Sequence, residues 1–257
     1  MLSPQLLKEF LDEKYDLYNR PEFIETDPIQ IPHTYTIPED IEIAGFLTAT
    51  IAWGQRKSII ANAHKLMQLM GNNPSDFIIN AGNEQVTRLK SFVHRTFQGD
   101  DCVFFLYALR NIYKNHGGLK SVFETSYATR KEMAEVLIDF RNIFFEIENC
   151  LERSRKHVSD VSKNAAAKRL NMFLRWMVRT DKRGVDFGLW KGIPASALYI
   201  PLDLHTGNVA RKIGLLARNQ SDWKAVAELT SNLRKFDPND PVKYDFALFG
   251  LGIFEKF

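Results

Sequence analysis

Helical spacing of apolar residues is the feature that most limits how this chain can fold. In residues 165–179, five apolar side chains at intervals of three and four share one helical face: Leu170, Phe173, Leu174, Met177 and Val178. Similar spacing predicts helices at about residues 4–18, 39–54, 58–70, 75–81, 84–90, 102–113, 119–127, 130–150, 165–179, 204–213, 222–235 and 242–254. Only residues 30–37 alternate apolar with polar residues, and Pro32 argues against a strand there. The sequence therefore predicts an all-α fold.

A proline-rich segment suggests how the helices are grouped. Pro21, Pro28, Pro32 and Pro38 lie between residues 20 and 39, which predicts an extended connection without helix. We therefore expect one two-lobed unit of 257 residues. Residues 40–145 would form one helical lobe, and residues 1–39 would join residues 146–257 in the other.

Composition excludes several classes of protein. Of the 257 residues 45% are apolar, but no run of about 18 apolar residues exists, so we expect no membrane association. The N-terminus lacks the apolar core of a signal peptide, which favours a cytoplasmic protein. Two cysteines, Cys102 and Cys150, are too few for a disulfide framework or a four-cysteine metal or iron–sulfur site. No nucleotide-binding or metal-binding motif is present, so we expect no cofactor and no metal, and we expect a monomer.

Positive charge is concentrated in the middle of the C-terminal half. Residues 151–220 hold 14 lysines and arginines against 5 acidic residues, whereas the rest of the chain holds 20 against 26. A basic region in an acidic frame is typical of a surface that binds a polyanion such as a nucleic acid. The alternative is an ordinary solvated helical surface.

Two residues in this region have reactive potential. Lys168 lies in the first turn of the predicted helix 165–179, on the face opposite the apolar stripe, together with Met172, Arg175 and Arg179. Cations are disfavoured at a helix N-terminus, and crowding with other cations favours a neutral, nucleophilic amine. Asp203 precedes the helix 204–213, where a carboxylate stays ionised. The alternatives are an exposed basic face for Lys168 and a plain N-cap for Asp203.

The residues around Asp203 also resemble a known motif. The run IPLDLHTGNVARKIGL is similar to the segment that carries the catalytic aspartate in the helix-hairpin-helix DNA glycosylase superfamily. With the helix KRLNMFLRWMVR and the C-terminal DPVKYDFALFGLG, it looks closest to an uncharacterised bacterial family related to the archaeal 8-oxoguanine DNA glycosylase branch. In that branch a lysine precedes the aspartate by some thirty residues, as Lys168 precedes Asp203.

The resemblance implies a base-excision repair enzyme. A damaged nucleotide, here oxidised guanine in duplex or single-stranded DNA, would be flipped into a pocket between the lobes. Asp203 would stabilise positive charge on the sugar and help to deprotonate the Lys168 amine. Lys168 would attack the anomeric carbon, and the resulting Schiff base would allow β-elimination and strand cleavage.

The resemblance also implies binding residues. Asp245 and Phe249, one helical turn apart, would contact the flipped base, and Trp53 and Gln55 stand where the superfamily has a loop that reaches the base or duplex. The turn Val161-Ser162-Lys163-Asn164 would replace the usual glycine-containing hairpin, since Asn tolerates a left-handed conformation. The expected phosphate contacts are Lys163, Asn164, Arg169, Arg175 and Arg211.

Three alternatives remain open. The first is a monofunctional glycosylase for alkylated bases, in which Asp203 activates water and Lys168 only binds phosphate. The second is a non-catalytic DNA- or RNA-binding protein that retains the fold. The third is an interaction protein without a nucleic acid partner.

Overall fold

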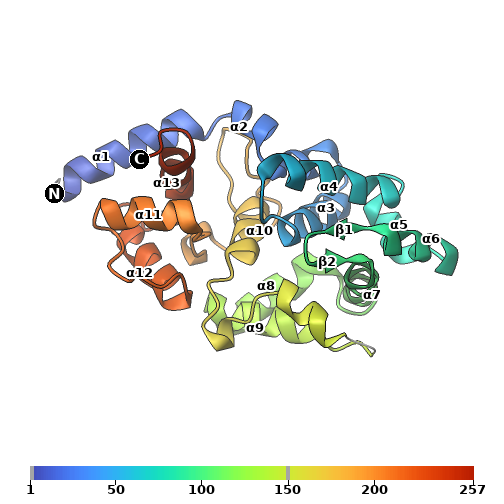
Figure 1. Cartoon of the computed structure of the whole chain (residues 1–257). Coiled ribbons are helices and arrows are strands. Elements are labelled where there is room, and N and C mark those ends of the chain that lie inside the picture. Colours follow the sequence, from blue (N-terminus) through green and yellow to red (C-terminus); the bar gives the residue numbers. More distant parts are fainter. Residues whose placement is uncertain (1–2, 149–150) are drawn as a thin grey trace. The chain divides into compact units, whose positions relative to one another are not determined.

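The computed structural model describes residues 3–148 and 151–257 (Figure 1). Within these residues the chain forms thirteen α-helices, several 3₁₀ turns and one hairpin of two-residue strands. The predicted all-α fold class is therefore confirmed. None of the described helices combines the length and apolar character needed to cross a membrane.

Contacts between residues divide the chain into two compact units. The terminal unit combines the residues up to Glu25 with Asp160–Phe257, and the middle unit is Thr26–Ser159. The first helix thus groups with the C-terminal part of the chain. Residues 26–39 and 146–159, which we expected in that same lobe, belong to the middle unit instead.

The proline-rich segment is not the extended connection that the sequence predicted. It forms helix α2 (Pro21–Thr26) and two 3₁₀ turns, Pro28–Gln30 and Pro32–Thr34, and helix α3 then begins at Pro38. Each of these four elements starts at a proline, because the first helical residue needs no N–H donor and its φ suits the proline ring. The turns pack on α3 and α4, which places residues 26–39 in the middle unit.

The middle unit is a helical bundle with an aromatic core. Its helices after α2 are α3 (Pro38–Thr50), α4 (Arg56–Leu69), α5 (Pro74–Asn80), α6 (Asn83–Arg88), α7 (Gly99–Asn115), α8 (Gly118–Arg130) and α9 (Met133–Phe144). At its centre Phe46 of α3 lies 6.1 Å from Phe105 of α7 and 5.5 Å from Phe144 of α9, measured between ring centroids. All three rings are fully or almost fully buried, so they hold the three helices together.

One hairpin interrupts the helices of the middle unit. Strands β1 (Val93–His94) and β2 (Phe97–Gln98) pair antiparallel, with His94 opposite Phe97. We predicted no strand, and this expectation was wrong. Two-residue strands are too short to show an alternating pattern, so periodicity does not detect them.

The terminal unit holds the remaining helices around a second apolar core. These are α1 (Pro4–Tyr18), α10 (Lys168–Val178), α11 (Leu204–Lys212), α12 (Trp223–Arg234) and α13 (Tyr244–Ile253). The first and last helices lie side by side (Figure 1), and α13 also packs against α11. The contact with α1 is close: a Cβ on Gly250 would lie 2.1 Å from the Tyr18 ring. Glycine is therefore required there to bring the two helices together.

Helix α10 is buried along most of its length. Every residue from Asn171 to Val178 is buried, and the following Arg179 is fully buried. The helical wheel placed Arg175 and Arg179 on the face opposite the apolar stripe, and the structure shows that this face is buried as well. Aspartates from other segments cover that face, as described below.

Candidate active site

Lys168 is the first residue of α10, and the residue before it has unusual backbone angles. Ala167, directly before it, adopts a left-handed conformation with φ of 50°, which is sterically unfavourable for a residue with a Cβ. The Lys168 side chain is half-buried, and its Nζ lies 3.6 Å from the Met172 sulfur. No carboxylate of the described residues lies within ion-pair distance of this amine. Lys168 is therefore a partly shielded amine without a salt bridge.

Asp203 is the N-cap of α11, as the plain structural interpretation predicted. Its Oδ1 accepts a hydrogen bond from the Thr206 amide at 2.9 Å. The side chain is half-buried, and its Oδ2 has no hydrogen-bond partner among the residues that the structure describes. The cap uses one oxygen and leaves the other available to a ligand or to a proton.

Asp245 connects these two groups electrostatically. It lies in the first turn of α13 and is only 6% exposed. Burial raises the pKa of its carboxyl group to about 6; Arg175 opposes this rise, the Asp203 charge adds to it, and the Lys168 charge opposes it. Lys168, Asp203 and Asp245 stand at the starts of α10, α11 and α13, and α13 packs against α11. These three residues are named the charge cluster below.

Arg175 holds Asp245 in place. One of its terminal nitrogens donates to Asp245 Oδ2, and its Nε donates to Asp186 Oδ1 at 3.2 Å. The guanidinium also lies 4.3 Å from the centre of the Phe246 ring. Arg175 is 4% exposed and engaged on both sides, so the phosphate contact expected from the sequence is not open to it in this structure.

Arg179, one turn after Arg175, is also bound by buried or partly buried acidic side chains. This side chain binds Asp186 at 3.0 Å, Asp240 at 2.9 Å and the Tyr15 hydroxyl at 2.8 Å. Asp186 thus bridges Arg175 and Arg179, one turn apart on α10. Sequence reasoning missed Asp186, although two arginines on a helix in an apolar environment require buried acidic partners.

Phe249 lies one turn after Asp245 on α13, as predicted. Its ring is half-buried and makes an edge contact with Phe23 at 6.2 Å. Asp245 uses Oδ2 for Arg175, and its Oδ1 has no hydrogen-bond partner among the described residues. The expected contact between this pair and a base therefore stays a prediction, with one carboxylate oxygen available for it.

The turn before α10 has a left-handed asparagine, a conformation that we expected Asn164 to tolerate. Asn164 has φ of 63°, and its side chain donates to Asp222 at 2.9 Å. However, the amides of residues 163, 164 and 165 all donate to carbonyls within the turn. Since those amides are occupied, they do not offer the anion site that a glycine hairpin gives. The exposed cation of this turn is Lys163, whose side chain is 82% exposed.

The other expected phosphate contacts differ in accessibility. Arg169 is half-buried, and burial lowers its pKa to about 10. Arg211 donates to the carbonyls of Arg218 and Asn219 at 2.9 Å, so it closes the loop after α11. Its expected role at a phosphate would require it to release these carbonyls.

Trp53 and Gln55 belong to the middle unit, whereas Lys168 and Asp203 belong to the terminal unit. The Trp53 ring stacks on His157 with centroids 5.9 Å apart, and it meets His94 edge-on at 5.0 Å. Gln55 is the exposed N-cap residue of α4. The buried Trp176 and Trp190 of the terminal unit are packing residues, which is the more ordinary of the two roles that tryptophan takes.

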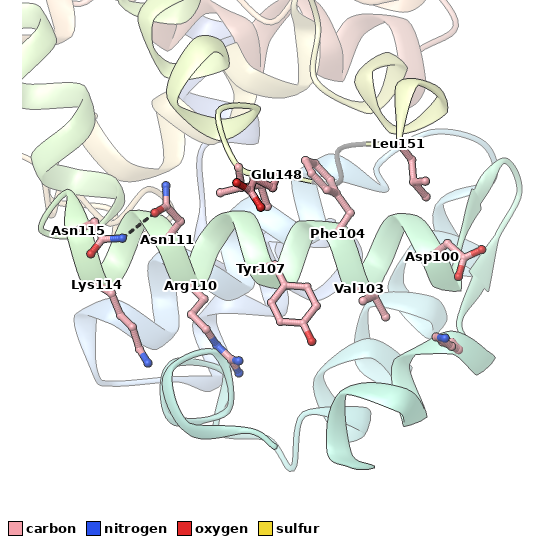
Figure 2. A pocket seen from close by; sticks show the side chains of 12 residues that line it. Asp100, Val103, Phe104, Tyr107, Arg110, Asn111, Lys114, Asn115, Glu148 and Leu151 are labelled. Carbon is pink, nitrogen blue, oxygen red and sulfur yellow. Dashed lines mark hydrogen bonds between the residues drawn. The ribbon is translucent and has the colours of Figure 1, made fainter. Parts of the chain in front are cut away.

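A hollow of about 890 Å³ lies along α7 in the middle unit (Figure 2). Phe104 and Tyr107 form its apolar wall. Arg110 points toward it but donates to the carbonyls of Ile78 and Ala81, and Asn111 binds Glu146. None of the residues predicted from the sequence lines this hollow. The charge cluster of the terminal unit is therefore the better candidate for chemistry.

The described residues contain no group of three or more His, Cys, Asp or Glu side chains arranged to hold a metal ion. The chemistry available to the cluster is that of an amine, a carboxylate with one oxygen free of hydrogen bonds, and a buried carboxyl group paired with Arg175. An amine can attack an electrophilic carbon, and a carboxylate can accept the proton that the amine loses.

Comparisons with known proteins identify the family alone. Neither a search of curated proteins nor a search of solved structures found a match. A family model described as "Protein of unknown function (DUF2400)" matches residues 27–254, which include every residue of the charge cluster. The chain belongs to this family.

Proposed function

We propose that this protein is a base-excision DNA glycosylase with an associated lyase activity, acting on oxidised guanine. The observation that carries the proposal is the cluster itself. Lys168 is half-buried without an ion pair among the described residues, and Asp203, the N-cap of α11 in the same unit, keeps one carboxylate oxygen free of hydrogen bonds. The similarity of the run around Asp203 to the helix-hairpin-helix DNA glycosylases suggests which reaction these residues carry out.

The proposed reaction uses the two residues in sequence. The Lys168 amine attacks C1′ of the damaged nucleotide, and the N-glycosidic bond breaks as the base leaves with the bonding electron pair. Asp203 stabilises the positive charge on the sugar and accepts the proton that the amine loses. The sugar ring then opens to a Schiff base on Lys168. Loss of a proton from C2′ expels the 3′ phosphate by β-elimination.

The half-buried position of Lys168 suits this role. Lys168 lies at the N-terminus of α10, its Nζ is next to the Met172 sulfur, and no carboxylate of the described residues pairs with it. Attack on a substrate therefore does not require the amine to leave an ion pair.

Exchange of the Asp203 carboxylate for an amide tests the proposal. In single-turnover release of 8-oxoguanine from a labelled duplex, Asp203→Asn should lower the rate by about 100-fold or more, because it removes the charge that faces the cationic sugar. Asparagine caps a helix as well as aspartate does, so α11 should remain intact.

A control is available at the N-cap of α9. Glu132 is exposed and accepts from the Ala134 amide at 3.4 Å. Glu132→Gln should leave base release within a few-fold of wild type. If Asp203→Asn also released the base at the wild-type rate, Asp203 would be only a helix cap and the proposed function would fail.

A further inference from the structure

We propose that the middle unit carries a surface that binds the phosphate backbone of DNA, formed by Arg95 of the turn between β1 and β2 and by Lys57 and Lys65 of α4. The inference rests on the proposed function and deepens it, because it names a part of the chain that holds the DNA strand. The surface lies wholly within the unit Thr26–Ser159.

Arg95 occupies a turn position at which glycine is usual. His94 pairs with Phe97, so Arg95 and Thr96 form a two-residue hairpin turn. Arg95 has φ of 55°, in the left-handed region, and the first residue of such a turn is ordinarily Gly, Asn or Asp. An arginine here is less stable than a glycine. Unfavourable backbone at an exposed charged residue indicates a function for its side chain.

The Arg95 guanidinium lies against the backbone of Gly54. A Cβ on Gly54 would lie 2.7 Å from Arg95 Nη1, and Gly54 has φ of 102°, which only glycine adopts readily. The Arg95 side chain is exposed and makes no hydrogen bond or ion pair with the other described residues. The guanidinium is therefore placed beside the loop that precedes α4, and its donors are available to a ligand.

Two lysines continue this positive surface along α4. Lys57 lies in the first turn of α4, three residues after Gly54, and Lys65 lies about two turns further on, about 12 Å along the helix axis. Both lysines are exposed, and neither has an acidic partner among the described residues. Over that length one strand of a duplex carries three or four phosphates, at about 3.4 Å each. The spacing therefore suits a nucleic acid backbone.

Acidic residues are absent from the two sequence segments that form this surface. Residues 43–75, which contain all of α4, hold two lysines and one arginine but no Asp or Glu. Residues 91–99, which contain the hairpin, hold Arg95 and no Asp or Glu. An ordinary solvated surface mixes charges of both signs. A surface of one sign with unpaired cations favours a polyanion as its partner.

The side chains between the lysines favour DNA over an anionic membrane. The exposed residues of α4, a helix that the structure describes completely, are otherwise small or polar: Ser58, Ala61, His64 and Gln68. A helix that binds a lipid surface carries bulky apolar residues next to its cations. The planar guanidinium of Arg95 also suits two parallel hydrogen bonds to one phosphate.

Fluorescence polarisation of a short labelled duplex, measured at a series of NaCl concentrations, tests the surface. Arg95→Gly removes the guanidinium and accepts the turn conformation, so this variant should be at least as stable as wild type. Its Kd for the duplex should rise about three- to tenfold, and the steepness of log Kd against log salt should fall by about 0.9, the value for one lost phosphate contact. Lys57→Gln and Lys65→Gln should show the same two changes.

Lys120→Gln is the matched control. Lys120 is an exposed lysine of α8 in the same unit, without a partner among the described residues, and its replacement changes the net charge by the same amount. It should change Kd by less than about twofold, because long-range attraction alone is largely screened by salt. An equal rise in Kd for Lys120→Gln and Arg95→Gly would overturn the inference, because net charge would then explain the binding.

Two further outcomes would also overturn it. One is a wild-type Kd and salt dependence in Arg95→Gly, Lys57→Gln and Lys65→Gln. The other is loss of binding to phosphatidylserine vesicles in these variants with an unchanged Kd for DNA, which would assign the surface to lipid.

Failure of the proposed function can be told apart from failure of this inference. A protein whose affinity for DNA depends on Arg95, Lys57 and Lys65 but that releases no damaged base has the surface and lacks the reaction. A protein that releases the base, and whose affinity for DNA is unchanged in all three variants, has the reaction and lacks this surface.

Discussion

Arg175 of α10 and Asp245 of α13 form an ion pair in which both side chains are buried. The pair joins the helix that carries Lys168 to the last helix of the chain. Arg175 also binds Asp186, so removal of the guanidinium leaves two carboxylates without it. The stability of the terminal unit therefore depends on this contact.

Removal of Arg175 should destabilise the protein strongly. Arg175→Met keeps most of the side-chain volume but leaves Asp245 as an unpaired buried acid, which should lower the free energy of unfolding by about 3 kcal/mol or more. Urea denaturation measures this change. Arg88→Met is the control, because Arg88 is 64% exposed and pairs with Glu84 at 3.5 Å. It should cost less than about 1 kcal/mol, and equal losses for the two variants would contradict the account.

Asp245 should also give stability a particular pH dependence. Its pKa in the folded protein, about 6, lies above its ordinary value of 3.8. The folded state therefore binds the proton more tightly, so the contribution of Asp245 to stability is complete below pH 3.8 and is lost as the pH rises through 6. Relative to Asp245→Asn, the wild type should lose stability between pH 4 and pH 7. A constant difference across urea denaturation series in that range would contradict this assignment.

The turn before α10 should tolerate glycine better than alanine at residue 164. Asn164 has φ of 63° and binds Asp222 through its side chain. Asn164→Ala loses that bond and keeps an unfavourable backbone, which should cost about 2 kcal/mol. Asn164→Gly also loses the bond but accepts the conformation, so it should retain more stability than Asn164→Ala. Thermal unfolding of the two variants compares them directly, and the reverse order would be inconsistent with the left-handed turn.

The helices of this chain were largely predictable from its sequence. Helix α1 has the predicted bounds, Pro4–Tyr18, because Ser3 caps it, Pro4 begins it and Leu7 and Leu11 face the core. At Asn164 the sequence allowed the left-handed conformation that the structure has, because Asn tolerates it. Local chemistry determines these features, so local sequence reveals them.

The surroundings of the candidate site were not predictable in the same way. The wheel placed Arg175 and Arg179 opposite the apolar stripe, and spacing alone does not show what covers that face. Their partners Asp186, Asp240 and Asp245 lie up to 70 residues away along the chain, and only the tertiary packing brings them to α10. The prediction of an extended connection in the proline-rich segment was wrong because a proline at the first position of a helix cannot be told from a proline in a loop by sequence alone.

The most direct test of the central claim is covalent trapping at Lys168. Wild-type protein incubated with a duplex that contains 8-oxoguanine, in the presence of sodium borohydride, should form a stable adduct whose cross-linked peptide contains Lys168. Lys168→Gln should form none, and Lys224→Gln, which changes a first-turn lysine of α12, should form the wild-type amount. Base release without any adduct would favour a monofunctional glycosylase. An adduct on another lysine, or an undiminished adduct with Lys168→Gln, would contradict the account.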